Sequence, residues 1–247
     1  MENSDVEKWD SLGIEYWQNR SVRQRWAHEY LLHPEFLRLI RSLEKLSFSK
    51  LLDFGCGDGC LLQYFRTHDL KYECFGYDRS QILMQIARKN HPDFNYINNL
   101  DNQTFDVICL NMDIQDVANP IALLNELGTA MNGSGILIIS IPHPVFSLIQ
   151  SQHFTTLRKI KNPSNQKDIY RYRFEESEEV FWNDNCSTST NLYNRTLATY
   201  VGFIRSSKLK IIDITEPYPI EQGQNDTELY NMHCLIPKFL FIVACKQ

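Results

Sequence analysis

The sequence predicts an α/β fold built on a doubly wound, mostly parallel sheet with helices on both faces. Two observations carry this prediction. From Lys50 onward, short apolar strands alternate with segments of helical periodicity, which is the pattern of a parallel sheet. The strands are continuously apolar, as expected when both faces of a sheet are buried. A chain of 247 residues, 43% of them hydrophobic, is long enough to bury such a core.

The first 47 residues are expected to form a helical cover for this sheet. Residues 15–32 have an amphipathic pattern, with apolar side chains recurring at helical spacing. His33-Pro34 is expected to end that helix, and a second helix is expected over 35–46, because the residue before a proline avoids the helical conformation.

The elements of the sheet follow in order. Strands are expected over 50–54, 72–77, 94–97, 105–110 and 135–141, with helices over 60–67, from the N-cap Ser80, and over 121–131. Between Pro142 and about Leu192 the alternation of strand-like and helix-like segments stops. Basic residues in this stretch are followed by an acidic run at 175–179. This stretch is either an insertion that covers a site or a solvated excursion whose charges pair on the surface. A helix returns from Thr196, and the closing strands are expected over 210–215 and 239–245.

The stretch LLDFGCGDG joins the first strand to the next helix through glycines at 55, 57 and 59. Such a turn lets the backbone approach a ligand and directs the free N–H groups of the helix toward it. The dinucleotide fingerprint is GxGxxG, whereas Cys60 makes the spacing here GxGxG. The motif therefore favours a ligand other than a dinucleotide, and a nicotinamide-dependent oxidoreductase becomes the weaker alternative.

Asp78 falls at the end of the second expected strand. A carboxylate at this point of a doubly wound sheet can accept hydrogen bonds from two adjacent ribose hydroxyls. The alternative is that Asp78 only helps Ser80 to cap its helix. Together with the glycine turn, Asp78 predicts a ligand that contains adenosine.

With further segments, these residues resemble the class I S-adenosylmethionine-dependent methyltransferases, in particular their small-molecule type 11 group. The matching segments are LLDFGCGDG (51–59), GYDRS (76–80), FDVICLNMDIQDV (105–117), GILIISIPHPVF (135–146), residues 193–219 and PKFLFIVACK (237–246). The resemblance implies a Rossmann-like, seven-stranded sheet whose last strand is antiparallel. It also implies S-adenosylmethionine as the cofactor and S-adenosylhomocysteine as the product.

The resemblance further implies that residues 1–247 are one methyltransferase domain. After the helical cover, residues 48–142 would form the cofactor-binding core. Residues 143–195 would form an insertion or lid on the substrate side, and residues 196–247 the late helix and the closing strands. A non-catalytic protein that kept this fold, with the insertion serving a partner, remains an alternative to an enzyme.

The residues that the resemblance assigns to the cofactor are Asp53, Gly55, Gly57, Asp78, Arg79, Asn98 or Asn99, Asn111, Met112 and Tyr16. Gly55 and Gly57 would flank the methionine part, and Asp53 would hold its amino group or fix the loop. Asn98 or Asn99 would face the adenine amino group. Tyr16 and its neighbour Trp17 either lie over the methionine end or simply pack the cover helix.

Three residues are assigned to the substrate side. Methyl transfer chiefly requires alignment of two reactants, and a base adds typically 10²- to 10⁴-fold for a hydroxyl or carbon acceptor. His143 is the candidate base, or else it orders the His-Pro turn into the insertion. Arg195 would reach an acidic substrate group or anchor the insertion, and Glu216 would face the substrate pocket.

Composition and missing motifs bear on the partners. The net charge of −5 and the pI near 5.8 argue against a dedicated nucleic-acid binder. The segment NMDI lacks the motif of adenine amino-methyltransferases, and IPHP lacks the cysteine of cytosine-carbon enzymes. The histidines have no ligand-like spacing, so no metal site is expected. No signal peptide or membrane-spanning run is recognised, so a cytoplasmic protein acting on a small molecule is predicted.

Overall fold

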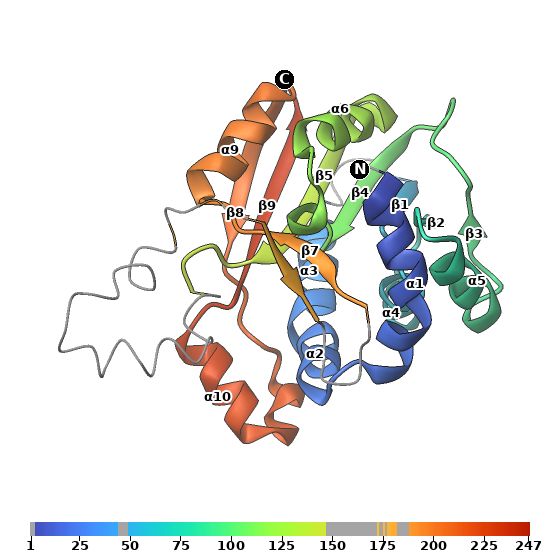
Figure 1. The fold of residues 1–247 in the computed structure, drawn as a ribbon. Helices are drawn as coiled ribbons and strands as arrows, with labels where there is room; N and C mark the ends of the chain where they lie inside the picture. The colour runs from blue at the N-terminus through green and yellow to red at the C-terminus, as the bar shows by residue number, and fades with distance from the viewer. Residues whose placement is uncertain (1–2, 44–48, 147–171, 173–174, 176, 182–187) are drawn as a thin grey trace.

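A computed structural model describes residues 3–43, 49–146, 172, 175, 177–181 and 188–247 (Figure 1). Its centre is a seven-stranded sheet in the order β3-β2-β1-β4-β5-β9-β8. The strands are β1 (Lys50–Phe54), β2 (Glu73–Tyr77), β3 (Asn95–Tyr96), β4 (Phe105–Asn111), β5 (Met131–Pro142), β8 (Leu209–Thr215) and β9 (Phe239–Lys246). The first five strands pair in parallel, and β9 is antiparallel to both β5 and β8. The predicted fold class and the antiparallel last strand are confirmed.

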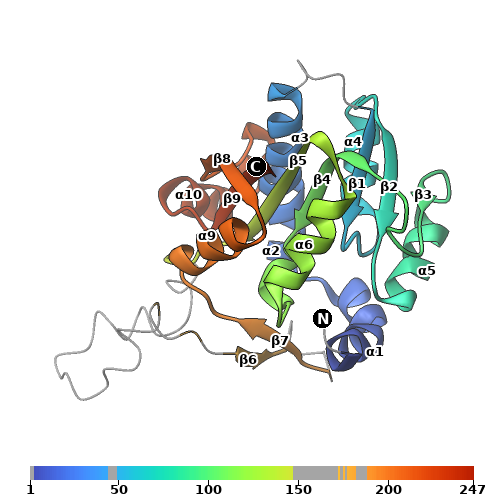
Figure 2. The same cartoon turned by 90° about the horizontal axis from the view of Figure 1, so that it is seen from above.

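Helices cover both faces of the sheet (Figure 2). They are α3 (His33–Ser42), α4 (Cys60–Thr67), α5 (Gln81–Asn90), α6 (Pro120–Ala130) and α9 (Leu197–Ser206). Helix α10 (Thr227–Leu235) instead packs through Leu229 against Trp26 and Ala27 of the N-terminal cover. One buried cluster joins α3 and α4 to the sheet, and a second joins α6 and α9 to its other face. None of the helices in the described part of the chain is long and apolar enough to cross a bilayer.

The helical cover differs from the prediction at its break. Helix α1 (Asn3–Asn19) ends before Ser21, which caps α2 (Val22–Ala27) in a reciprocal capping box with Gln24. The predicted break at His33-Pro34 is wrong, because the chain stays helical across it. A π turn, η1 (His28–Leu32), accommodates the proline. The N–H of His33 donates to the carbonyl of His28, and the chain continues directly into α3.

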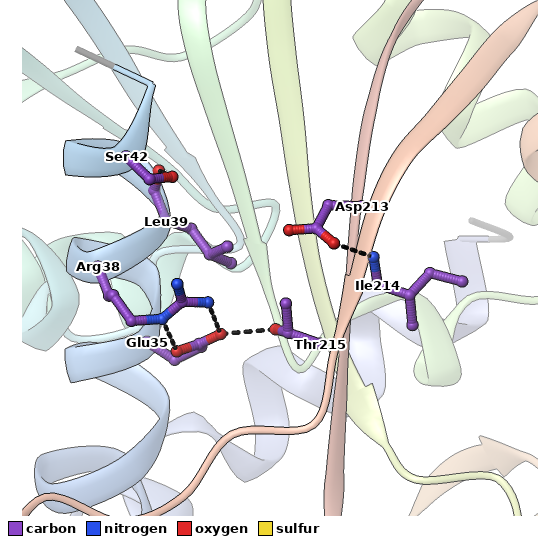
Figure 3. Close-up of polar contacts among 7 residues, drawn as sticks. All are labelled: Glu35, Arg38, Leu39, Ser42, Asp213, Ile214 and Thr215. Carbon is purple, nitrogen blue, oxygen red and sulfur yellow. Dashed lines mark hydrogen bonds and ion pairs between the residues drawn. The ribbon is translucent and has the colours of Figure 1, made fainter.

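Helix α3 is fastened to the edge strand β8 through a buried carboxylate (Figure 3). Glu35 is 7% exposed and accepts two hydrogen bonds of 2.7 Å from Arg38. Thr215, the last residue of β8, donates its hydroxyl to the same carboxylate. Because a buried carboxylate without partners is costly, this network fixes how the cover sits on the sheet.

Part of the predicted insertion is a two-stranded hairpin, β6 (Ser177–Val180) and β7 (Thr190–Tyr193). It packs near α1 and the short helix η2 (Ile114–Asp116) that follows β4. Lys8 of α1 donates to Glu179 at 3.2 Å and to Asn191 at 3.1 Å. Residues 147–171 of the expected insertion lie outside the described residues. The hairpin joins the insertion to the N-terminal cover at the carboxyl edge of the sheet.

Candidate cofactor and active site

The turn between β1 and α4 is held open by glycines in the left-handed region. Gly55, Gly57 and Gly59 have φ angles of 74°, 54° and 83°. A Cβ on Gly55 would overlap the carboxylate of Asp113, so that position has room only for hydrogen. A Cβ on Gly57 would have no atom within 4 Å, so it would project into open space. Gly57 thus presents bare backbone to a cavity, as the sequence predicted.

That cavity encloses about 1080 Å³ of empty space, its open mouth included. Its floor is the carboxyl ends of β1, β2 and β4, and its wall is the N-terminal cover. Of the residues predicted to bind the cofactor, Asp53, Gly55, Gly57, Asp78, Arg79, Asn111 and Met112 line it.

Asp78 connects the end of β2 to the glycine turn. Its Oδ2 accepts from the N–H of Gly57 at 2.9 Å, and its Oδ1 accepts from the N–H of Ser80 at 2.8 Å. Each carboxylate oxygen has a second lone pair free for a ligand. Burial raises the pKa of Asp78 to about 6, although the two backbone bonds favour the ionised form. Asp78 therefore supports the cap at Ser80 and also offers acceptors to the cavity.

Two further carboxylates in the cavity have buried oxygens without partners in the described part of the chain. They are Oδ1 of Asp53 and Oδ2 of Asp113. Burial raises the pKa of both carboxyls well above the usual range, and repulsion from the carboxylate of Asp78 adds to the effect in each. An ammonium or a sulfonium placed between them would relieve both penalties. These acceptor oxygens therefore fit the cationic methionine part of S-adenosylmethionine. Asp113 was not predicted, although its place just after β4 could have indicated it.

The end of β4 is held in a constrained shape next to these carboxylates. Met112 has a φ of 61°, which is uncommon for a residue with a side chain. Its N–H donates to the carbonyl of Ser140 at 3.2 Å, and the hydroxyl of Ser140 donates to Asn111 at 2.9 Å. Backbone held in such a region is typical of ligand sites. Asn111 and Met112 thus lie where the sequence predicts the reacting end of the cofactor.

The wall contributed by the cover was largely missed by sequence reasoning. Trp17, Arg20, His28 and His33 all line the cavity. Arg20 pairs with Asp58, and the ring centroids of His28 and His33 are 5.3 Å apart. Burial lowers the pKa of His28 to about 4, so its imidazole is neutral at pH 7. The two histidines are five positions apart, and only the π turn places them on one side. No signal in the sequence indicates that turn.

The structure places the side chain of Trp17 but not that of Tyr16. Trp17 lines the cavity and is 37% exposed. The side chain of Tyr16 lies outside the described residues, so its predicted role stays a prediction.

Asn98 and Asn99, expected near the adenine, are both exposed. The side chain of Asn98 accepts from Arg88 at 2.9 Å, and that of Asn99 accepts from the N–H of Asp101 at 3.1 Å. Neither lines the cavity. Arg79 does line it, and its guanidinium pairs with Glu126 at 2.8 Å.

His143 and Glu216 meet at the carboxyl edge, beyond the lining of the cavity. His143 is 4% exposed, and its Nε2 lies 3.0 Å from Oε1 of Glu216. Its Nδ1 accepts from the N–H groups of Val145 and Phe146 at 3.2 and 3.3 Å. With Nδ1 accepting, the ring proton is on Nε2 and is donated to Glu216. Both ring nitrogens are thus engaged in ordering the start of the insertion.

Arg195 also binds protein atoms. Its guanidinium donates to the carbonyl oxygens of Ile114 and Val117 at 3.0 and 2.6 Å and lies over the ring of Tyr193. Of the two predicted roles, this geometry favours anchoring. It fastens the returning end of the insertion to the loop after β4.

Comparison with known proteins gives the family. The model of the family described as "Methyltransferase domain" matches residues 20–181, more than half of the chain. An uncharacterized protein of Haemophilus influenzae is 27% identical over 236 residues, covering 89% of this chain and 88% of that protein. The ubiquinone biosynthesis O-methyltransferase of Coxiella burnetii is 24% identical, covering 87% and 85% of the two chains.

Among solved structures, the fold is similar to that of a putative S-adenosylmethionine dependent methyltransferase from Listeria monocytogenes. The TM-score is 0.59 at 20% identity, and the match covers 81% of this chain and 90% of that one. The family match agrees with the glycine turn, Asp78 and the acidic cavity. The chain therefore belongs to the methyltransferase-domain family, as a class I S-adenosylmethionine-dependent methyltransferase.

Proposed function

We propose that this methyltransferase acts on a small organic acceptor, with the cavity beside the glycine turn holding the cofactor. The observation that carries the proposal is the meeting of bare backbone at Gly57 with unpaired carboxylate oxygens on Asp53 and Asp113. When bound, S-adenosylmethionine supplies a methyl group activated by a positively charged sulfur. The name of the Coxiella relative, an O-methyltransferase of ubiquinone biosynthesis, supports an acceptor of small-molecule size.

In this proposal the residues of the chain orient and shield the reactants. Asp53 and Asp113 hold the ammonium end of the cofactor, and Asp78 accepts from the ribose hydroxyls. The strained backbone at Met112 fixes the side from which the acceptor approaches. Alignment alone can contribute roughly 7 to 11 kcal/mol to lowering the barrier. The excess of carboxylates suits a cationic cofactor, and the net charge of −5 gives no support for a nucleic-acid acceptor.

The acceptor is proposed to bind between this cavity and the insertion. Strand β7 of the hairpin contacts both α1 and η2, two elements that contribute residues to the lining of the cavity. Residues 147–192 are therefore proposed to supply part of the acceptor pocket. His143 is proposed as a positioning residue, because its two ring nitrogens already hold the backbone of residues 145–146 and Glu216.

Thermal unfolding with added ligands tests the cofactor assignment against the oxidoreductase alternative. S-adenosylhomocysteine at 100 times its Kd stabilises a one-site protein by about 2.7 kcal/mol. For a chain of this size that corresponds to a rise in Tm of roughly 5–10 °C. NAD⁺ and NADH at the same concentration are expected to leave Tm unchanged. A shift with the nicotinamide nucleotides and none with S-adenosylhomocysteine would refute the proposal.

A further inference from the structure

Helix α1 of the cover packs against α5, the helix that begins just after Asp78. Gly13 allows the close approach, because a Cβ there would meet side-chain atoms of Ile82 at 3.2 Å and of Leu83 at 3.4 Å. Trp9 and Trp17 of the same helix line the cavity. The position of α1 on α5 therefore sets one wall of the cofactor cavity.

The carboxylate of Asp10 makes a polar contact at this junction. The hydroxyl of Ser80, the N-cap of α5, donates to Oδ1 of Asp10 at 2.6 Å, and the N–H of Ile82 donates to the same oxygen at 3.4 Å. Ser80 is 1% exposed, and its Oγ also accepts from the N–H of Leu83. Hydrogen bonds to a charged acceptor are roughly twice as strong as neutral ones. Asp10 thus fastens the cover to the cap of α5 at a buried point.

Ser80 also connects Asp10 to the cofactor site. Its N–H donates to Oδ1 of Asp78, whose Oδ2 accepts from the N–H of Gly57. Ser80 therefore gives its N–H to the carboxylate that is assigned to the ribose, and its O–H to the carboxylate of the cover. Contiguous hydrogen bonds of this kind are a physical route by which two parts of a protein can be coupled.

The carboxylates of Asp10 and Asp78 also repel each other across Ser80. Burial is the largest cause of the raised pKa of Asp78, and the charge of Asp10 raises that pKa further. The other titratable groups that face Asp78 are Asp53, Cys56, Tyr77, Arg79 and Asp113. All of these stay in place when Asp10 is replaced, so removing its charge is expected to lower the pKa of Asp78.

We propose that Asp10 is a positioning residue of the cofactor site, which couples the docking of α1 to the binding of the ribose at Asp78. Because such coupling is reciprocal, a docked cover strengthens cofactor binding and a bound cofactor strengthens the docking of the cover. This inference rests on the proposed function, which assigns Asp78 to the ribose hydroxyls. The wall that Trp9 and Trp17 contribute is then held most firmly when the cofactor is bound.

Hydrogen exchange and calorimetry with S-adenosylhomocysteine test the coupling at pH 8, where Asp78 is ionised because its pKa is about 6. The ligand is expected to slow amide exchange in α1 of the wild-type protein. In Asp10→Ala this slowing is expected to be lost, and affinity to fall about 5- to 10-fold, the lower end of the usual coupling between sites. Asp10→Asn keeps an oxygen that accepts from Ser80, so it is expected to restore both. Glu7→Ala removes an exposed carboxylate of the same helix and is the matched control.

The pH profile of affinity separates this role from simple support of the fold. In the wild type, affinity is expected to fall below about pH 6, as Asp78 takes up a proton. In Asp10→Asn the fall is expected at lower pH, because the repelling charge is gone while the hydrogen bond remains. Glu7→Gln is expected to keep the wild-type profile.

Three results would each overturn the inference. They are α1 exchange in the wild type that ignores S-adenosylhomocysteine, wild-type affinity in Asp10→Ala at pH 8, and an unshifted pH profile in Asp10→Asn. The last of these can be measured even if Asp10→Ala does not fold. A wild-type protein that does not bind S-adenosylhomocysteine at all would count against the proposed function instead.

Discussion

Replacing Gly57 with valine is expected to abolish the binding of S-adenosylhomocysteine while the protein stays folded. A Cβ at this position meets no atom within 4 Å, so the added side chain enters the cavity without a clash. The φ of 54° makes any side chain strained there, at a cost of roughly 1–2 kcal/mol. Calorimetry measures the loss of binding, and a thermal melt followed by circular dichroism measures the retained fold.

Two glycine variants control for this interpretation. Gly133 is exposed in β5 and also has open space around its Cβ, so Gly133→Val is expected to keep full affinity. Gly55→Val is expected to destabilise the protein itself, because its Cβ would overlap the carboxylate of Asp113. If Gly57→Val bound S-adenosylhomocysteine as tightly as the wild type, the cavity would not be the cofactor site.

Replacing Asp78 with alanine is expected to reduce affinity for S-adenosylhomocysteine by more than 100-fold, to the point where calorimetry detects no binding. Two hydrogen bonds from ribose hydroxyls to a charged acceptor account for about 3 kcal/mol or more. The change also removes the acceptor for the N–H of Gly57, which helps to shape the turn. Asp101→Ala, in the exposed loop after β3, is the control that is expected to keep wild-type affinity.

The pKa of Asp78, near 6, adds a pH dependence with a definite sign. The ribose hydroxyls need the ionised carboxylate as their acceptor. Below about pH 6 the unliganded carboxyl takes up a proton that binding must release, so affinity falls as the pH falls. The decrease approaches tenfold per pH unit if only the ionised form binds. Affinity that stays constant between pH 7 and 5 would contradict the assigned role of Asp78.

The parts of the site that sequence reasoning predicted are those with local causes. A glycine at 57 and an acid at 78 predict one ligand site, because the order of strand, turn and helix along the chain brings both residues to the same edge of the sheet. The strands β1, β4 and β5 are continuous apolar runs, which burial on both faces explains. The bounds of β1 and β4 were predicted closely for the same reason, whereas β5 begins at Met131, before the predicted start at Gly135.

The parts that were missed depend on contacts between distant segments. The pairing of Arg20 with Asp58 joins the cover to the glycine turn, two segments far apart in the sequence. The approach of His28 to His33 requires the π turn, whereas the proline in the sequence predicted only a break in the helix.

A crystal structure with S-adenosylhomocysteine tests the central claim most directly. The account predicts the ribose hydroxyls within hydrogen-bond distance of Asp78 and the amino group beside Asp53. It also predicts the sulfur facing the chain at Met112, with part of residues 147–192 on the open side. A ligand bound elsewhere, or a cavity beside Gly57 that stays empty at saturating ligand, would contradict it.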